Sequence, residues 1–136
     1  MTAKQYLSRA YGLRRRIAAK ELHLEELRTQ AEHITADLTG MPRGSGTSSP
    51  VERIAVQIAD LSQEIEYDWL DLIAYQEEIR KTIELLPDPV MVQVLSYRYL
   101  SYKRWQDIAD LMHYSVRHTT RIHGYALKAI DGLLCP

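Results

Sequence analysis

Two arginines one helical turn apart, Arg117 and Arg121, lie in the segment "SVRHTTR" that runs from Ser115 to Arg121. A guanidinium group can donate two parallel hydrogen bonds to the edge of a guanine, or it can bind a phosphate oxygen. Ser115 is placed to cap the helix that carries both arginines, which leaves the first turn of that helix free to point outward. These residue types at this spacing are typical of a helix that reads DNA.

The helix predicted from Val116 to about Leu133 has two different sides. An inward stripe at helical spacing contains Thr119, Ile122, Ala126, Ile130 and Leu133. The residues expected to face DNA are Ser115, Val116, Arg117, His118, Thr120, Arg121 and Lys128. His123 is a further candidate for a phosphate contact from the polar side.

Charge is divided unevenly along the 136-residue chain, although the formal net charge is only -1. Residues 1–89 carry 11 Lys and Arg against 15 Asp and Glu, whereas residues 90–136 carry 6 against 3. The two parts therefore have net charges of -4 and +3. A basic surface attracts polyanions, so the C-terminal third is the part expected to meet nucleic acid.

The residues before this helix complete the pattern of a helix-turn-helix. A helix is predicted from Trp105 to Met112, and Ala109 supplies the small side chain needed where two helices cross closely. The apolar side of the unit is expected to contain Ile108, Met112 and Tyr114. His113 stands at the turn, where histidine tolerates a left-handed backbone better than most residues. A first helix from Val90 to Leu100 makes this a three-helix domain over residues 90–134.

Residues 1–86 are predicted to form a long antiparallel helical hairpin, a coiled-coil arm. Apolar residues recur at steps of three and four from Tyr6 to Leu38 and again from Val51 to Leu86. The segment 39–50 between them is rich in Gly, Ser and Pro and is predicted to be a flexible loop. The expected fold class is therefore all-α, with the hairpin preceding the helix-turn-helix domain.

Both ends of the second long helix are marked by local signals. Ser49 is a candidate N-cap, with Pro50 at the first helical position and Glu52 at the third, as in a capping box. The two prolines of "LPDPV", residues 86–90, prevent the helix from continuing and mark the predicted domain boundary.

One pair of charges interrupts the two apolar seams. In the antiparallel register that pairs Ala10 with Ile79 and Leu24 with Ile65, the polar members Lys20 and Asp68 fall opposite one another. A facing ion pair of this kind specifies register better than it adds stability, because desolvation offsets the Coulomb attraction. Lys20 and Asp68 are the expected register pair, and the alternative is that each charge extends to solvent.

Other chemistry-bearing residues do not form a recognisable site. His113, His118 and His123 recur every five residues, a spacing that cannot converge on a metal ion from one helix face. The single cysteine, Cys135, cannot form an internal disulfide. Carboxylate pairs such as Glu77 with Glu78 lie on amphipathic helices without a convergent pocket, so we expect no enzyme, no metal and no cofactor. Trp69 and Trp105 are interpreted as core anchors. The run 14–16, "RRR", is interpreted as a solvated face, with a second DNA or RNA contact as the alternative.

The sequence contains no apolar run near the ~20 residues that span a bilayer and begins with no signal-peptide pattern. We therefore expect a cytoplasmic protein that does not enter a membrane.

The stretch from Val94 to Ile130, "VLSYRYLSYKRWQDIADLMHYSVRHTTRIHGYALKAI", resembles region 4 of bacterial sigma-70-type factors, the helix-turn-helix that reads the -35 promoter element. Together with the hairpin, the chain resembles the ArpU/RinA-type regulators of phages and prophages. The resemblance implies a sigma-like activator of late phage genes, with promoter DNA and RNA polymerase as partners, acting in a bacterial host cell.

Two residues depart from the family pattern. Val116 stands where region 4 usually has a polar reader, so it can only touch a thymine methyl group or pack. His113 replaces the usual glycine of the turn. No segment resembles region 2, which melts the -10 element in a complete sigma factor, so an activator or partial sigma-like factor is expected. The competing interpretation is a non-enzymatic coiled-coil adaptor or structural protein that forms a homodimer through the hairpin.

Overall fold

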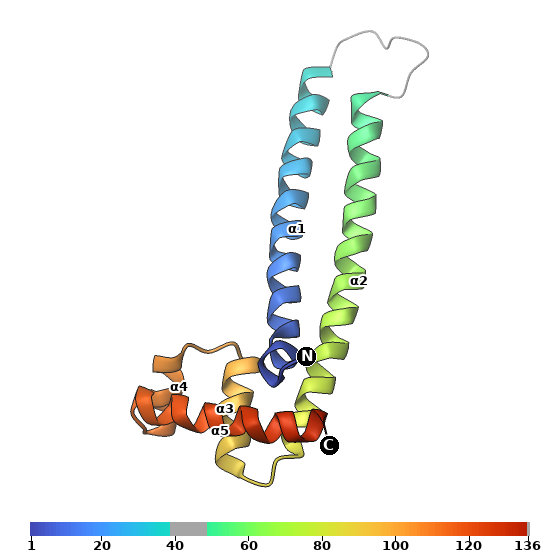
Figure 1. Ribbon diagram of the computed structural model, residues 1–136. Helices are drawn as coiled ribbons and strands as arrows, with labels where there is room; N and C mark the ends of the chain where they lie inside the picture. Colours follow the sequence, from blue (N-terminus) through green and yellow to red (C-terminus); the bar gives the residue numbers. More distant parts are fainter. Residues whose placement is uncertain (39–48, 136) are drawn as a thin grey trace. The chain divides into compact units, whose positions relative to one another are not determined.

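A computed structural model describes residues 1–38 and 49–135, and within those residues it contains five α-helices and no β-strand (Figure 1). The helices are α1 (Ala3–Leu38), α2 (Pro50–Glu84), α3 (Pro89–Tyr99), α4 (Trp105–Met112) and α5 (Val116–Leu134). The predicted all-helical class is confirmed. The predicted flexible loop 39–50 lies outside the described residues except for Ser49 and Pro50.

Residue contacts divide the chain into two compact units. Met1–Leu13 and Leu72–Pro136 form the first unit, and Arg14–Asp71 form the second. The boundary expected from the prolines separates α2 from α3. The contacts instead group the first turns of α1 and the last turns of α2 with the three C-terminal helices.

The second unit is held together by an apolar seam and by the ion pairs of Lys20. Its buried residues are Ile17, Leu24, Leu27, Leu61 and Ile65. Lys20 Nζ lies 2.6 Å from Asp68 Oδ2 and 3.9 Å from Glu64 Oε1, so the structure brings the expected register pair together. The hydrogen bond to Asp68 raises the pKa of the Lys20 ammonium, and the charges of both carboxylates act in the same direction.

Trp69 is not a core residue in this unit. Its side chain is 42% exposed, and its Nε1 donates a hydrogen bond to Glu21 Oε1 at 3.3 Å. The expectation of a core anchor is wrong because Trp69 follows the seam residue Asp68 directly and so turns toward solvent. At the start of α2, Ser49 Oγ accepts a hydrogen bond from the Glu52 amide at 3.2 Å, which confirms the predicted N-cap.

The first turns of α1 contribute to the core of the first unit. Ala3 and Leu7 are buried although neither belongs to the predicted seam, and seam residues Tyr6 and Ala10 are buried beside them. The Ala3 amide donates a 2.7 Å hydrogen bond to Asp131 Oδ1 on α5. This part of α1 therefore packs on a wider face than a two-helix seam requires.

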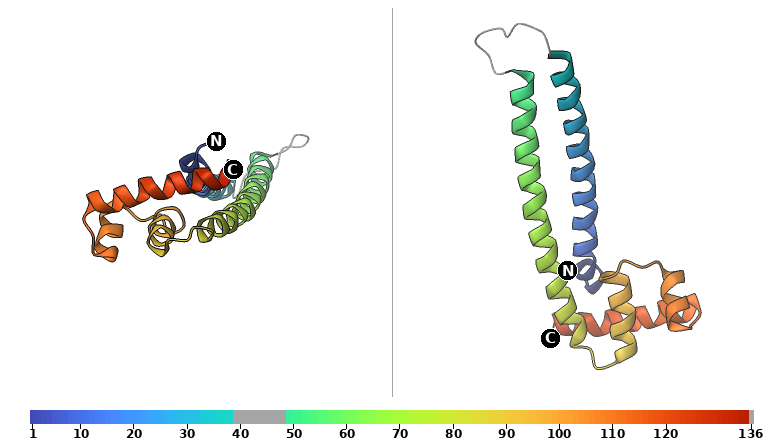
Figure 2. Two further views of the ribbon diagram at one scale, coloured as in Figure 1. Left: turned by 60° about the horizontal axis from the view of Figure 1, so that its bottom comes forward. Right: turned by 180° about the vertical axis from the view of Figure 1, so that it is seen from behind.

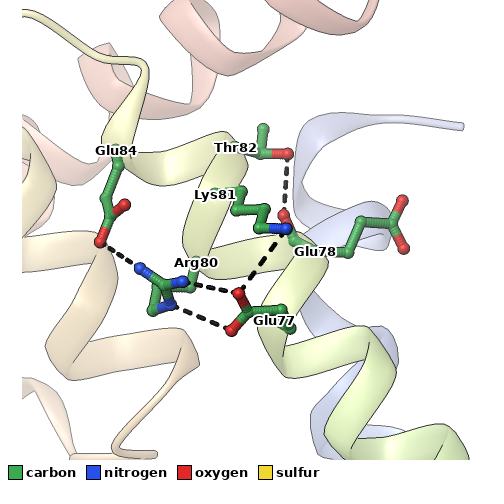
Figure 3. A network of polar contacts seen from close by, with 6 residues as sticks. All are labelled: Glu77, Glu78, Arg80, Lys81, Thr82 and Glu84. Atoms are coloured by element: carbon green, nitrogen blue, oxygen red, sulfur yellow. Dashed lines mark hydrogen bonds and ion pairs between the residues drawn. The ribbon is translucent and has the colours of Figure 1, made fainter.

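The last turns of α2 carry a solvated network of charges (Figure 3). Arg80 contacts Glu77 at 2.6 Å and Glu84 at 2.7 Å, and the hydrogen bond from Arg80 lowers the pKa of the Glu77 carboxyl. Such exposed pairs contribute little to stability. Beyond them, Asp88 caps α3 by accepting a hydrogen bond from the Val90 amide at 2.9 Å.

Helix α5 packs against both α3 and α4 (Figure 2). The buried residues of these three helices are Val94, Leu95, Tyr99, Ile108, Ala109, Thr119, Ala126 and Ile130. Two residues predicted to pack inward do not, because Tyr114 lies in the turn and Leu133 in the last turn of α5. Their side chains are 39% and 43% exposed.

The ion pair between Lys20 and Asp68 can be tested through the midpoint of thermal unfolding. Lys20→Asp and Asp68→Lys should each lower the midpoint of thermal unfolding, because each places like charges next to one another in a half-buried position. The double exchange, which restores opposite charges, should recover most of that loss. Circular dichroism melts of the four proteins measure the effect.

The exposed pair Arg104 and Asp107 provides the control, because its atoms lie 3.2 Å apart on a solvated surface. The same exchange there should change the midpoint little. A double exchange at Lys20 and Asp68 that is merely as unstable as its two single changes combined would exclude a register role.

Candidate nucleic-acid interface

The N-terminus of α5 is held by a side-chain cap. Ser115 has extended backbone angles, and its Oγ accepts a hydrogen bond from the His118 amide at 3.1 Å. Its carbonyl oxygen accepts hydrogen bonds from the Thr119 amide at 3.0 Å and from Thr119 Oγ1 at 2.9 Å. The predicted cap is confirmed. Because Thr119 is fully buried, these bonds also fix how the first turn of α5 is rotated.

The turn between α4 and α5 depends on a left-handed residue. His113 has φ 61° and ψ 38°, which confirms the expectation that histidine takes this conformation here. The following amide, of Tyr114, donates to the carbonyl of Ala109 at 3.0 Å and so closes the end of α4.

Three cations share one exposed face of α5, which we call the cationic face: Arg117, Arg121 and Lys128. At about 100° per residue, their positions fall within about 40° of one another around the helix axis. All three are exposed, and none forms an ion pair with another residue in the described part of the chain. Their charge is therefore available to a polyanion.

Gly124 lies on this same face, between Arg121 and Lys128. A Cβ built there meets no atom within 4 Å, so internal packing does not require glycine. A glycine inside a helix costs roughly 1 kcal/mol relative to alanine. The consequence of its presence is a low point in the surface, where another molecule can approach the α5 backbone.

The other residues predicted to face DNA differ in how exposed their side chains are. Val116 is 37% exposed, and His118 is exposed with its ring edge-on to Tyr114 at 4.8 Å. Thr120 is half-buried, its Oγ1 donates to the Arg117 carbonyl at 3.0 Å, and its side chain lines a cleft beside α5. The structure thus brings the cations together and turns Thr120 away from them.

His123 is not on the polar face. It is half-buried, its Nε2 lies 2.7 Å from the Tyr99 hydroxyl, and its ring meets Trp105 edge-on at 4.6 Å. Burial, followed by the positive charges of Arg98 and Lys4, lowers the pKa of His123 to about 4. The suggested phosphate contact from the polar side is therefore wrong, because this ring is neutral at physiological pH and faces inward.

Comparisons with known proteins add no relative: no protein-family model, no curated protein and no solved structure matches the chain. The resemblance to sigma region 4 accordingly stays a prediction that depends on the residues quoted for it.

The described residues contain neither a metal site nor a membrane span. Among them, no group of three or more His, Cys, Asp or Glu side chains is arranged to hold a metal ion. No helix within that part of the chain is long and apolar enough to cross a membrane.

One group of residues escaped the sequence analysis. Lys4, Arg98 and Arg104 line the same cleft as Thr120, although Lys4 is far from the other two in sequence. The segment "SYRYLSYKRW", residues 96–105, contained a usable signal, because it interleaves aromatic residues with cations. Nothing in the sequence places Lys4 beside that segment.

The left-handed backbone of His113 can be tested through the free energy of unfolding. His113→Gly should raise the free energy of unfolding by up to about 1 kcal/mol, because glycine adopts positive φ without the steric cost of a Cβ. The control His118→Gly lies inside α5 and should instead lower it by about 0.5 kcal/mol. Urea titrations measure both, and equal losses would contradict the assigned backbone conformation.

The lowered pKa of His123 makes a prediction about acid stability. Between pH 6.5 and about 4 the unfolded chain binds a proton at this residue and the folded chain does not. Acidification should therefore destabilise the wild type by at most about 1.4 kcal/mol per pH unit through this group. His123→Gln removes this contribution. In urea titrations from pH 8 to 4.5, the free energy of unfolding of the variant relative to that of the wild type should therefore increase below pH 6.5. A constant difference would contradict the prediction.

Proposed function

We propose that this chain is a non-enzymatic, DNA-binding regulator of transcription that reads duplex promoter DNA with α5. The observation that carries the proposal is the cationic face: three exposed cations that pair with no other described residue, on the capped second helix of a helix-turn-helix. An isolated exposed arginine is usually only solvated. Three on one helix face, with no Asp or Glu from Ser115 to Ala129, form a surface suited to a polyanion.

The positions of the cations along α5 suggest which of them would contact bases and which a phosphate. The major groove is about 12 Å wide and admits a helix, whose N-terminal residues meet the base edges. Arg117 and Arg121 lie near that end and are the proposed base readers. Lys128 lies about 10 Å farther along the helix, a distance suited to a phosphate contact. Gly124, between them, would let the DNA approach the helix closely.

The regulatory class comes from the resemblance in the sequence. A sigma-like activator of late phage or prophage genes would bind the promoter through α5 and contact RNA polymerase with another surface. Under this proposal the second unit serves as an arm, and the protein acts in the cytoplasm of a bacterial host.

An adaptor that self-associates through the hairpin is a second candidate, favoured by apolar residues on the surface of the second unit. The exposed members are Leu22, Val56, Tyr67, Trp69 and Leu70, with exposures from 42% to 64%. Of these, Val56, Tyr67 and Leu70 fall within about 60° of one another around α2. Burying such side chains is favourable, so two copies could pair along that side of the helix. Both functions can coexist, because a dimer would present two copies of α5 to spaced half-sites.

A selection on DNA tests the leading proposal. The protein should enrich particular sequences from a pool of duplexes with a randomised centre, and its affinity for the selected duplex should fall steeply between 50 and 200 mM salt. Arg117→Ala/Arg121→Ala should weaken binding by about tenfold or more per arginine and relax the selected sequence.

The control removes two exposed arginines elsewhere: Arg28→Ala/Arg53→Ala makes the same change in net charge on the second unit. It should retain both affinity and sequence preference. Equal behaviour of the two double variants, or no binding by the wild type, would reject DNA reading by α5. A concentration-dependent mass in analytical ultracentrifugation, lost on Tyr67→Ser/Leu70→Ser, would then support the adaptor.

A further inference from the structure

A cleft of about 380 Å³ lies in the first unit, away from the cationic face. Its walls come from the first turns of α1, from α3, from the connection that leads to α4, and from α5. This volume is within the range of small-molecule sites. It is larger than a packing defect between helices, and the chemistry of its lining side chains indicates what kind of ligand it could hold.

The charge of this cleft has one sign. Three cations line it, Lys4, Arg98 and Arg104, and no Asp or Glu is among its lining residues. Asp107 lies just outside and contacts Arg104 Nε at 3.2 Å, which leaves the terminal nitrogens of that guanidinium for another acceptor. Cations of one sign along the walls of a cleft raise the local concentration of anions.

Arg98 is held in position rather than solvated. Its guanidinium lies over the Trp105 ring at 4.6 Å, and its Nη1 donates to the Lys103 carbonyl at 3.0 Å. The fields of Arg98 and Lys4 reach the interior of the cleft, since both contribute to the lowered pKa of His123. A fixed guanidinium loses less conformational entropy on binding an anion than a mobile one.

The backbone that shapes the cleft is strained. Tyr102 has φ 57°, a conformation that is a genuine outlier for a bulky residue. It is maintained by neighbouring hydrogen bonds, from the Ser101 amide to the Ser96 carbonyl and from the Lys103 amide to the Tyr97 carbonyl. Strain of this kind concentrates at binding sites. Here it presents the Tyr102 ring and Arg104 to the cleft.

The walls also have aromatic and hydroxyl character. The Tyr11 and Tyr102 rings lie 5.8 Å apart, and Trp105, with Arg98 over its ring, lines the cleft beside them. Ser8 and Thr120 add hydroxyl groups. Cations with hydroxyl donors suit a phosphate group, and aromatic rings suit the planar base attached to it.

We propose that this cleft is a second anion site, which binds the phosphate of a nucleotide with the base against the aromatic wall. The nucleotide can be free or part of a DNA strand, and both present the same chemistry. The inference does not depend on promoter reading by α5, because its residues are different ones.

Fluorescence of Trp105 tests the proposal. Trp69→Phe removes the other tryptophan and leaves Trp105 as the reporter in the full chain. Titration with deoxyadenosine monophosphate should give a saturable change, and deoxyadenosine, which lacks the phosphate, should bind at least about tenfold more weakly. In the same background Lys4→Gln/Arg104→Gln should weaken nucleotide binding at least about tenfold.

Two controls separate this site from the rest of the molecule. Arg53→Gln/Lys81→Gln removes the same charge outside the cleft and should bind the nucleotide as the parent does. Arg117→Ala/Arg121→Ala should do so as well, so failure of DNA reading by α5 leaves the cleft proposal standing. Circular dichroism establishes that every variant is folded.

A competition experiment with duplex DNA distinguishes the two sources of phosphate. If a strand of bound DNA occupies the cleft, the monophosphate should compete with duplex and Lys4→Gln/Arg104→Gln should weaken duplex binding. If the ligand is a free nucleotide, the monophosphate should bind without displacing duplex. No saturable response to the monophosphate at millimolar concentration, or equal binding by the cleft variant and its control, would overturn the proposal.

Discussion

The first unit depends on the burial of the N-terminal turns of α1. Leu7 and Ala3 are covered there, and the Ala3 amide is bonded to Asp131 near the end of α5. Burying one leucine contributes roughly 1.5–3 kcal/mol, and a buried amide without an acceptor would cost a comparable amount. Lys4, Ser8 and Tyr11 project from the same turns, so this packing also positions one wall of the cleft.

Stability and surface chemistry are separated along α5. Its buried side, with Thr119, Ala126 and Ile130, fixes the helix against α3 and α4, and its opposite side carries the cations that pair with no other described residue. The cations contribute nothing to the core, so they can be changed without loss of fold. Gly124 lies on this outer side and weakens the helix without an internal reason. Under the proposed function, close approach of DNA to the backbone would offset this local cost.

Local patterns in the sequence predicted the helices and their caps well. The expected α4 has the bounds observed, α3 begins one residue earlier than expected, and Ser49, Ser115 and His113 act as their residue types imply. The same reasoning missed Leu7, because a two-helix seam has no place for it, and it overestimated the burial of Trp69 and Leu133. The cleft was unpredictable for a related reason. Lys4 lies near Arg98 only because of tertiary packing, and no residue type at positions 101–104 predicts the positive φ of Tyr102.

The pairing of Ala3 with Asp131 also has a consequence for synthesis on the ribosome. Ala3 and Asp131 lie 128 residues apart in the sequence, so the first turns of α1 are translated long before their acceptor. Until α5 follows, Leu7 has no complete core to enter, so the first unit cannot close before that helix is available. Closing the unit requires contacts between segments far apart in the sequence, which form slowly. A fragment beginning at residue 90 would lack one wall of its own domain.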